Sequence, residues 1–473
     1  MALREPLPFG HRAFYTLGER ALEVDERVVV FTCEPRTEVI RVADHFRLHL
    51  DSPRRLFDYH AFPDGEGIPR FQTKRALEDA ITYARFVESY GSVEKPIYGQ
   101  GLKGKVVYVV QRLDSDLTPQ DLSWRLRQVV QTAKYQGAEA VVVLAYTLNY
   151  SAQERGTLDK DHHRMKNDKA MRSFDGQMPS AFQMLETLLT AGADAVITPH
   201  SHCPDDLSRI ANELNELYYP LHQRAVAQGS NMRYKIDFHH VDLSPMIGYM
   251  VSDFGEEHLG FDLSEEGRRI LFVGADDGAA EFARNCRIHS GLKRSALGIM
   301  TKRKAPDGSI EILALDQVEG LDESRNIEGM DILCVDDLIR TAATMRNNMK
   351  AVRGENVGNL ERALTFCGQP RKIAVYATRS DLSSEARGVL RDPAIDTVVL
   401  TNADHRALQN LAGIGDKTLL AYINFVMAFS ARAVEKGENP NNVLTPETIR
   451  NGRLLQMLRP HGYRKEVDLR RPI

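Results

Sequence analysis

Eight short apolar runs rich in Val, Ile and Leu recur along the chain, and they constrain the fold more than any other feature of the sequence. Most are continuous rather than alternating, as expected of strands buried on both faces. They read RVVVF, KVVYVVQ, AEAVVVLAY, ADAVITPH, RRILFVGADDG, MDILCVDD, RKIAVYATRS and IDTVVLTN. Segments with helical period lie between them, such as residues 121–138 and 180–193, and each of these two ends near a glycine suited to a helix C-cap. The alternation predicts an α/β protein with parallel sheets.

Composition narrows the class of protein. The 473 residues are 42% hydrophobic and 27% charged, which is typical of soluble globular domains. A net charge of -4 argues against a general affinity for nucleic acid or anionic membranes, and no apolar run is long enough to span a bilayer. The five cysteines are odd in number and form no CxxC pair. We therefore expect a reducing, cytoplasmic environment, and neither a nucleic acid nor a membrane as partner.

One apolar run ends in two adjacent carboxylates, Asp336 and Asp337, and continues into the segment LIRTAATMRNN. Parallel sheets place their ligands beyond the carboxyl ends of the strands. Small residues at the start of the following helix let an anion approach its backbone N–H groups, and the threonines add hydroxyls. The pattern is typical of a phosphate site beside acids that bind sugar hydroxyls or Mg²⁺. The alternative is a strand end whose Asp and Thr side chains only cap a helix.

Further motifs occur in a fixed order around this segment: AFPDGEG, NYSAQERG, AGADAVITPHSHCPD, VGADDGAAEFAR and MTKRKAPDGSIEI. Together with the acid pair and the T-x-x-T loop, they resemble the motifs of the ribose-phosphate diphosphokinases, the phosphoribosyl pyrophosphate synthetases. The resemblance covers roughly residues 29–437. It implies two tandem type I phosphoribosyltransferase-like domains, each with a doubly wound, mostly parallel sheet flanked by helices.

The resemblance also implies domain bounds and a reaction. We predict an N-terminal extension (1–28), an ATP-side domain (29–215), a ribose-phosphate-side domain (216–437) and a C-terminal extension (438–473). The family transfers the β,γ-diphosphoryl group of ATP, with Mg²⁺, to the anomeric hydroxyl of ribose 5-phosphate and releases AMP. A homo-oligomer, either a dimer or a hexamer, is the expected assembly.

Residue roles are carried over from the family motifs. Ribose 5-phosphate is expected at Asp336, Asp337, Arg340, Thr341, Ala342, Ala343 and Thr344; ATP at Phe62, Asp64, Glu66, Gln153, Glu154 and His202; magnesium at His202 and Asp276; and catalytic cations at Lys302, Arg303 and Lys304. Such cations suit a transfer in which negative charge builds up on the phosphate oxygens and catalysis is largely alignment.

Plainer interpretations stand beside these roles. The run TKRKAPDGS also fits a basic hairpin exposed to solvent. His202 also fits a hydrogen-bonded polar residue near the end of a strand, and Asp276 also fits a turn that binds no metal. We interpret His239 and His240 as exposed loop histidines rather than metal ligands. The helical spacing around residues 217–229 suggests an additional pocket wall or an oligomer contact.

The sequence also departs from the family pattern. Ala152 stands where the family has an arginine that would bind ATP phosphates, and Arg340 replaces an acid in the phosphate loop. Two alternatives to ribose 5-phosphate transfer therefore remain: the same transfer to a larger 5-substituted ribose such as ADP-ribose, and a non-catalytic regulatory paralogue of a synthetase.

Overall fold

A computed structural model describes the following residues: 27–32, 57–61, 67–71, 102–112, 118–148, 150, 179–304, 310–321, 326–339, 342–354, 368–380, 384–403, 414–421, 423–445 and 457–458. The chain forms two compact units, each described here by itself. The N-terminal unit contains His11–Val241 and Asn424–Asn441, and the C-terminal unit contains Asp242–Ile423 and Asn442–Arg471. Among the described residues, no helix combines the length and the apolar character needed to cross a membrane.

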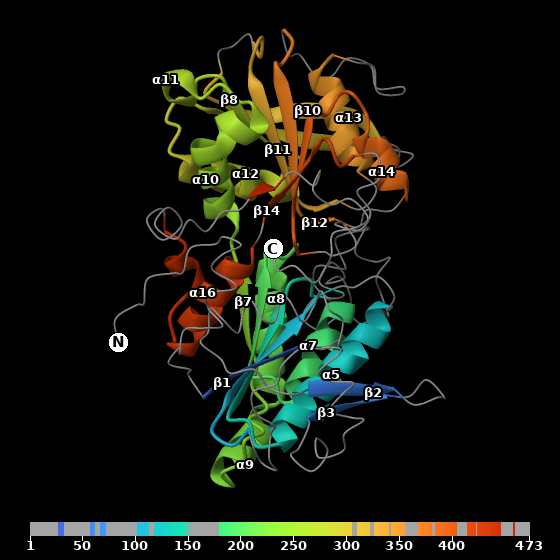
Figure 1. The fold of residues 1–473 in the computed structure, drawn as a ribbon, viewed down its shortest axis with the longest axis vertical. Helices are drawn as coiled ribbons and strands as arrows, with labels where there is room; N and C mark the ends of the chain where they lie inside the picture. Colours follow the sequence, from blue (N-terminus) through green and yellow to red (C-terminus); the bar gives the residue numbers. More distant parts are fainter. Residues whose placement is uncertain are drawn as a thin grey trace, which may run out of the picture. The chain divides into compact units, whose positions relative to one another are not determined.

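The N-terminal unit is built on a five-stranded sheet whose neighbouring strands are all parallel (Figure 1). Its order follows the chain: β1 (Val28–Thr32), β4 (Val106–Gln111), β5 (Ala140–Ala145), β6 (Ala195–Pro199) and β7 (Asp237–Val241). A separate antiparallel pair is formed by β2 (Phe57–Ala61) and β3 (Gly67–Phe71). All carboxyl ends of the five parallel strands therefore lie at one edge of the sheet.

Helices cover both faces of this sheet: α5 (Pro119–Tyr135), α7 (Ser180–Ala191), α8 (Pro204–Leu217) and α16 (Asn424–Glu435). The largely exposed α9 (Tyr219–Ala227) follows α8 and packs against it. Helix α5 begins at a capping box in which the Thr118 hydroxyl accepts the Asp121 N–H and the Asp121 carboxylate accepts the Thr118 N–H. Helix α7 ends at Gly192, whose φ of 101° lies in the left-handed region that favours glycine.

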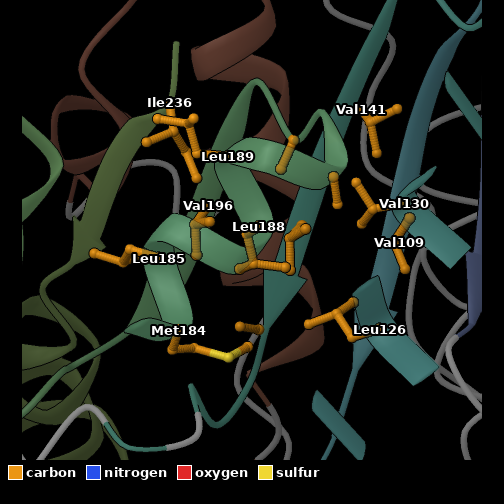
Figure 2. Packing of buried hydrophobic residues seen from close by; sticks show 14 of the residues in the cluster. Val109, Leu126, Val130, Val141, Met184, Leu185, Leu188, Leu189, Val196 and Ile236 are labelled. Carbon is orange, nitrogen blue, oxygen red and sulfur yellow. The ribbon is translucent and has the colours of Figure 1, made fainter. Parts of the chain in front are cut away.

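The two faces of this sheet pack against different helices. Val107 and Val109 of β4 join the core formed with α5 and α7, and Figure 2 shows Leu126, Val130 and Leu188 from these helices in that core. The intervening Tyr108 points the other way, and its hydroxyl donates to the Ala431 carbonyl oxygen of α16 (3.4 Å). This alternation is the period of two expected for a strand covered on both sides.

The C-terminal unit contains an eight-stranded, mostly parallel sheet. Its order is β10 (Ile310–Glu319), β9 (Ala296–Lys304), β8 (Ile270–Gly274), β11 (Asp331–Ile339), β12 (Lys372–Ser380), β13 (Thr397–Thr401), β14 (Thr418–Ala421) and β15 (Met457–Leu458). Only the terminal pairs, β10 with β9 and β14 with β15, are antiparallel. The chain passes from β8 to β9 on one side and then returns to β11 on the other side of β8, so the strand order reverses between β8 and β11.

The remaining described helical segments belong to this unit, apart from the turn at Pro440–Val443, which spans the boundary between the two. They are α10 (Ser244–Phe254), η3 (Gly255–Leu259), α11 (Ser264–Gly267), η4 (Asp277–Ala279), α12 (Ala280–Ser290), α13 (Ala343–Val352), α14 (Ser384–Leu390) and η5 (Pro440–Val443). Helix α13 contributes Met345 and Met349 to the core beneath β11 and β12. Helices α10 and α12 cross closely at Gly248, where a Cβ would lie 2.6 Å from the Ser290 nitrogen.

The predicted α/β architecture is confirmed, because each of the eight apolar runs contains a strand and the sheets are mostly parallel. The division between units differs from the expected one. The segment 216–241 belongs to the N-terminal unit, since β7 completes its sheet, and α16 also packs there through Tyr108 and Tyr146. Describing His239 and His240 as exposed loop residues was wrong: both lie in β7 and are partly buried.

Candidate active site

The candidate site of the C-terminal unit lies where β8 and β11 end. Pairing between these strands stops at Gly274 and Val335, so Asp336 is the first residue of β11 beyond the end of β8. The Ala275 N–H still donates to the Val335 carbonyl oxygen (3.1 Å) and holds the following turn against β11. This is the point at which the strand order reverses, and open α/β sheets bind ligands in the crevice at such a point.

Asp336 and Asp337 form the centre of this edge. The Asp337 N–H donates to Asp336 Oδ1 (2.9 Å), and both side chains are partly buried. Burial, followed by the charge of Asp337 and then that of Asp276, raises the pKa of Asp336 to about 8. Two acids and a nearby third carboxylate therefore concentrate negative charge, and hydrogen-bond donors or a cation are the ligands that relieve it.

Asp276 belongs to the same edge, in the turn that follows β8. Its carboxylate accepts the N–H groups of Gly278 (3.1 Å) and Ala279 (3.3 Å), so it caps the short helix η4. The turn brings Ala279 close to the end of β8, because a Cβ atom added to Gly274 would lie 3.1 Å from the Ala279 carbonyl oxygen. The structure thus confirms the turn-capping interpretation of Asp276 and also places its charge within reach of Asp336.

Helix α13 begins just after β11, in an unusual backbone conformation. Ala342 has a φ of 60° and lies in the left-handed region, which costs a residue with a Cβ about 1–2 kcal/mol. The Arg346 N–H donates to the Ala342 carbonyl oxygen (2.9 Å), so the helix starts at once and directs its first N–H groups out of its amino end. Left-handed and right-handed residues in succession form the concave backbone arrangement that binds anions.

The basic run at Lys302, Arg303 and Lys304 forms the last part of strand β9. Their backbones pair with Leu313, Ile312 and Ile310 of β10, which confirms a hairpin at this place. Pairing of β9 with β8 ends at Ile299, so the basic run extends past the carboxyl end of β8. The side chains of these three residues, and the whole of residues 305–309, lie outside the described part of the structure.

Two comparisons with known proteins bear on this arrangement. The chain is 25% identical over 287 residues to the ribose-phosphate pyrophosphokinase of Methanopyrus kandleri, an alignment that covers 60% of this chain and 76% of that protein. It also superposes on the crystal structure of phosphoribosylpyrophosphate synthetase from Mycobacterium smegmatis with a TM-score of 0.56 and 16% identity, covering 87% of this chain and all of that one. The chain is thus similar in sequence to a ribose-phosphate pyrophosphokinase and similar in fold to a phosphoribosylpyrophosphate synthetase. No protein-family model matches it.

Both similarities agree with the resemblance found in the motifs, and the structural similarity confirms the predicted fold, whereas the individual site residues remain predictions. Asp276, Asp336, Asp337, Ala342 and Ala343 lie at one edge of the C-terminal sheet. His202 belongs to the N-terminal unit, exposed in the turn between β6 and α8. The remaining predicted residues lie outside the described part of the structure, wholly or in their side chains: Phe62, Asp64, Glu66, Gln153, Glu154, Arg340, Thr341 and Thr344.

Two residues at this edge were not recognised from the sequence. Asn348 is fully buried on α13 and its side-chain amide donates to the Ala275 carbonyl oxygen (2.7 Å), which ties the helix to the Asp276 turn. Arg379, near the end of β12, lies opposite Leu338 of β11, close to the carboxyl ends of both strands. The sequence marks Asn348 only as a polar residue one helical turn after Thr344 of the T-x-x-T motif.

Proposed function

We propose that this protein is an ATP-dependent diphosphokinase that transfers the β,γ-diphosphoryl group of ATP to the anomeric hydroxyl of ribose 5-phosphate and releases AMP. One observation carries the proposal: the acids Asp276, Asp336 and Asp337 and the left-handed start of α13 share the edge where the strand order reverses. A sugar phosphate needs both features, acceptors for ring hydroxyls and a backbone cradle for its anion.

In this proposal Asp336 and Asp337 accept hydrogen bonds from the ribose 2- and 3-hydroxyls. Hydroxyl donors relieve the repulsion that raises the pKa of Asp336, so sugar binding favours the ionised acid. The loop from Arg340 to Thr344 binds the 5-phosphate, with the backbone N–H groups of the first α13 turn directed at its oxygens.

The acids at this edge also fit Mg²⁺. No group of three or more His, Cys, Asp or Glu residues with metal-binding geometry occurs in the described ranges. Mg²⁺ does not need one, because it usually takes one or two carboxylates together with substrate phosphates and water. Asp336 and Asp276 provide oxygen ligands whose charges already act on one another. A bound Mg²⁺ would offset charge on the transferred phosphates.

The hairpin β9–β10 suits the role of a cover over the reacting phosphates. Lys302, Arg303 and Lys304 continue β9 beyond its last pair with β8, on the carboxyl side of the sheet where Asp276 also lies. In the proposed reaction, Lys302 stabilises the charge that builds up on the transferred oxygens and on the departing AMP. Closure of the hairpin would exclude water, which otherwise hydrolyses ATP.

The test is an incubation of the purified protein with ATP, Mg²⁺ and ribose 5-phosphate, with AMP measured by chromatography and the sugar product by mass. A parallel incubation with ADP-ribose tests the larger acceptor. We expect AMP and a product heavier than ribose 5-phosphate by one diphosphoryl group. Release of ADP in place of AMP contradicts the proposed transfer.

Two matched variants connect the activity to the site. Asp337→Asn removes one acid at the end of β11 and should abolish sugar-dependent AMP release. Asp416→Asn removes the same charge from an exposed turn that precedes β14, at the opposite edge of the sheet, and should leave turnover unchanged. Equal activity in the two variants would place the reaction elsewhere. The ADP-ribose alternative gains no support from the described residues, because it depends on Arg340.

A further inference from the structure

Exposed apolar side chains gather at the end of α8 and along α9. Seven large hydrophobic side chains are exposed in the described part of the chain, and four of them lie within ten positions: Leu217 (63% exposed), Tyr219 (54%), Leu221 (42%) and Val226 (59%). Single exposed hydrophobic residues are ordinary, whereas a group of this size is typical of an interaction surface.

Helix α9 contributes little to the core of its own unit. Of its nine residues only Ala225 is buried, and seven are exposed (Figure 1 shows the helix projecting beyond the N-terminal sheet). So short a helix normally derives its stability from packing against other elements rather than from its own propensity. Its large apolar side chains therefore have a capacity for contacts that the N-terminal unit does not use.

The topology places this surface near the amino edge of the sheet. The chain leaves the carboxyl end of β6, returns through α8 and α9, and then enters β7, which is parallel to β6. The Asn231 side-chain amide, just after α9, donates to the Lys134 carbonyl oxygen at the end of α5, a helix that likewise leads back to the start of a strand (2.7 Å). Parallel sheets bind ligands at the opposite edge, so this position favours an oligomer contact over an additional pocket wall.

The exposed side chains surround an uncharged crest on α9. Tyr219 and Val226 are seven positions apart, two turns of the helix, and so share one flank, whereas Leu221 lies on the other flank. The residues between the flanks, farthest from the buried Ala225, are small or neutral: Pro220, Gln223 and Ala227. A crest of this kind allows another surface to approach closely.

The charge of this segment limits the kind of partner. Between residues 217 and 227 only Arg224 carries a formal charge when histidine is neutral. Nucleic acids and anionic membranes select strongly basic surfaces, so neither suits this one. The centres of protein interfaces are depleted of charged residues and enriched in tyrosine, which matches the composition of α9.

The exposed area suits a second copy of the same surface. The four large side chains together expose roughly 400 Å², about half of the 800 Å² or so that each partner contributes to a stable interface. This share is close to the non-polar fraction of a typical interface, about 56–58%. In a twofold contact the same surface meets itself, and a nearly neutral surface does so without repulsion between like charges.

We propose that α9 and the end of α8 form a twofold contact between two copies of this chain. The contact defined here consists of Leu217, Tyr219, Leu221 and Val226, with the crest of α9 between them. It does not depend on the proposed diphosphoryl transfer, because it lies away from the carboxyl edge of the sheet.

Sedimentation equilibrium of the intact protein over a range of concentrations tests the contact. We expect the wild type to associate, with a mass that rises with concentration. Val226→Glu places an unpaired charge in the contact twice, once from each copy, and should raise the dissociation constant at least about tenfold. Ile288→Glu adds the same charge at an exposed apolar residue of α12 and should associate as the wild type does.

Hydrogen-exchange mass spectrometry of the wild type locates the contact without any substitution. The backbone amides of α9 should exchange more slowly as the protein concentration rises, whereas those of the buried strand β5 should exchange at the same rate throughout. Asp337→Asn separates this contact from the proposed reaction, because it should lose turnover yet associate as the wild type does.

Three results would overturn the proposal. The first is a wild type that remains a single chain at every concentration, and the second is wild-type association of Val226→Glu. The third is an assembly in which exchange in α9 does not depend on concentration, because the surface would then be left to a different partner.

Discussion

Asp336→Asn should stabilise the ligand-free protein while it weakens function. In the folded state the pKa of Asp336 is raised from 3.8 to about 8, chiefly by burial and by the charge of Asp337. The folded state therefore holds a proton that the unfolded chain releases, and the stability from this group is lost as pH rises from about 4 to about 8. Asparagine carries no charge at any of these pH values and keeps the oxygen that accepts the Asp337 N–H.

The magnitude follows from the shift. At about 1.4 kcal/mol per pKa unit, the full penalty at pH 7 is on the order of 4 kcal/mol. We expect about half of it, about 2 kcal/mol, because Asp337 shares the repulsion and relieves part of it by its own protonation. For a unit of this size, 2 kcal/mol raises the melting temperature by about 4–8 °C.

Calorimetry of the wild type and Asp336→Asn across this pH range is the direct measurement. The melting temperatures should converge as the pH falls below 3.8, where the acid becomes protonated in both states, and should separate progressively towards pH 8. Asp416→Asn, at the opposite edge of the sheet, should show no such trend. A variant that is less stable at pH 8, or a difference that does not change with pH, would refute the reasoning about Asp336.

Three further predictions concern individual contacts. Arg371→Leu removes the cation that pairs with the fully buried Asp331, so urea denaturation should show a loss of roughly 3 kcal/mol at neutral pH, and less in acid because burial raises the pKa of Asp331. Asn348→Leu leaves the Ala275 carbonyl oxygen without its donor, which should cost about 1–2 kcal/mol in thermal stability and raise the KM for ribose 5-phosphate more than that for ATP. Lys302→Ala should lower kcat at least about 100-fold with little change in sugar binding, as measured by steady-state kinetics and equilibrium dialysis.

The fold could be predicted where the local sequence pattern alone identifies the type of element. Strands such as β5 and β11 are buried on both faces, so their apolar runs have no competing interpretation. Strand β7 was missed because its sequence, DFHHV, contains three polar residues. Without it, the N-terminal unit was predicted to end near residue 215 and not at Val241.

The candidate site was predicted in part for a similar reason. Adjacent acids after an apolar strand indicate a site by themselves, whereas the approach of Asp276 to Asp336 depends on the pairing of β8 with β11. Strand pairing is a long-range property that a local pattern does not contain. The basic run at Lys302 fits the hairpin of the plainer interpretation, because its backbone pairs with β10.

Ionisable groups of opposite sign lie at the carboxyl ends of the two sheets: Asp336 in the C-terminal unit and Arg112 in the N-terminal unit. In the C-terminal unit, burial and neighbouring acids raise the pKa of Asp336, so the edge requires donors or cations. In the N-terminal unit, Arg112 is buried, and among the described residues its Nε and Nη2 have no hydrogen-bond partner. A protein that evolved for stability alone would satisfy each group internally, since unpaired buried charge costs several kcal/mol. For the edge of the C-terminal sheet, the ligand that we propose is a hydroxyl-rich sugar phosphate with its metal ion.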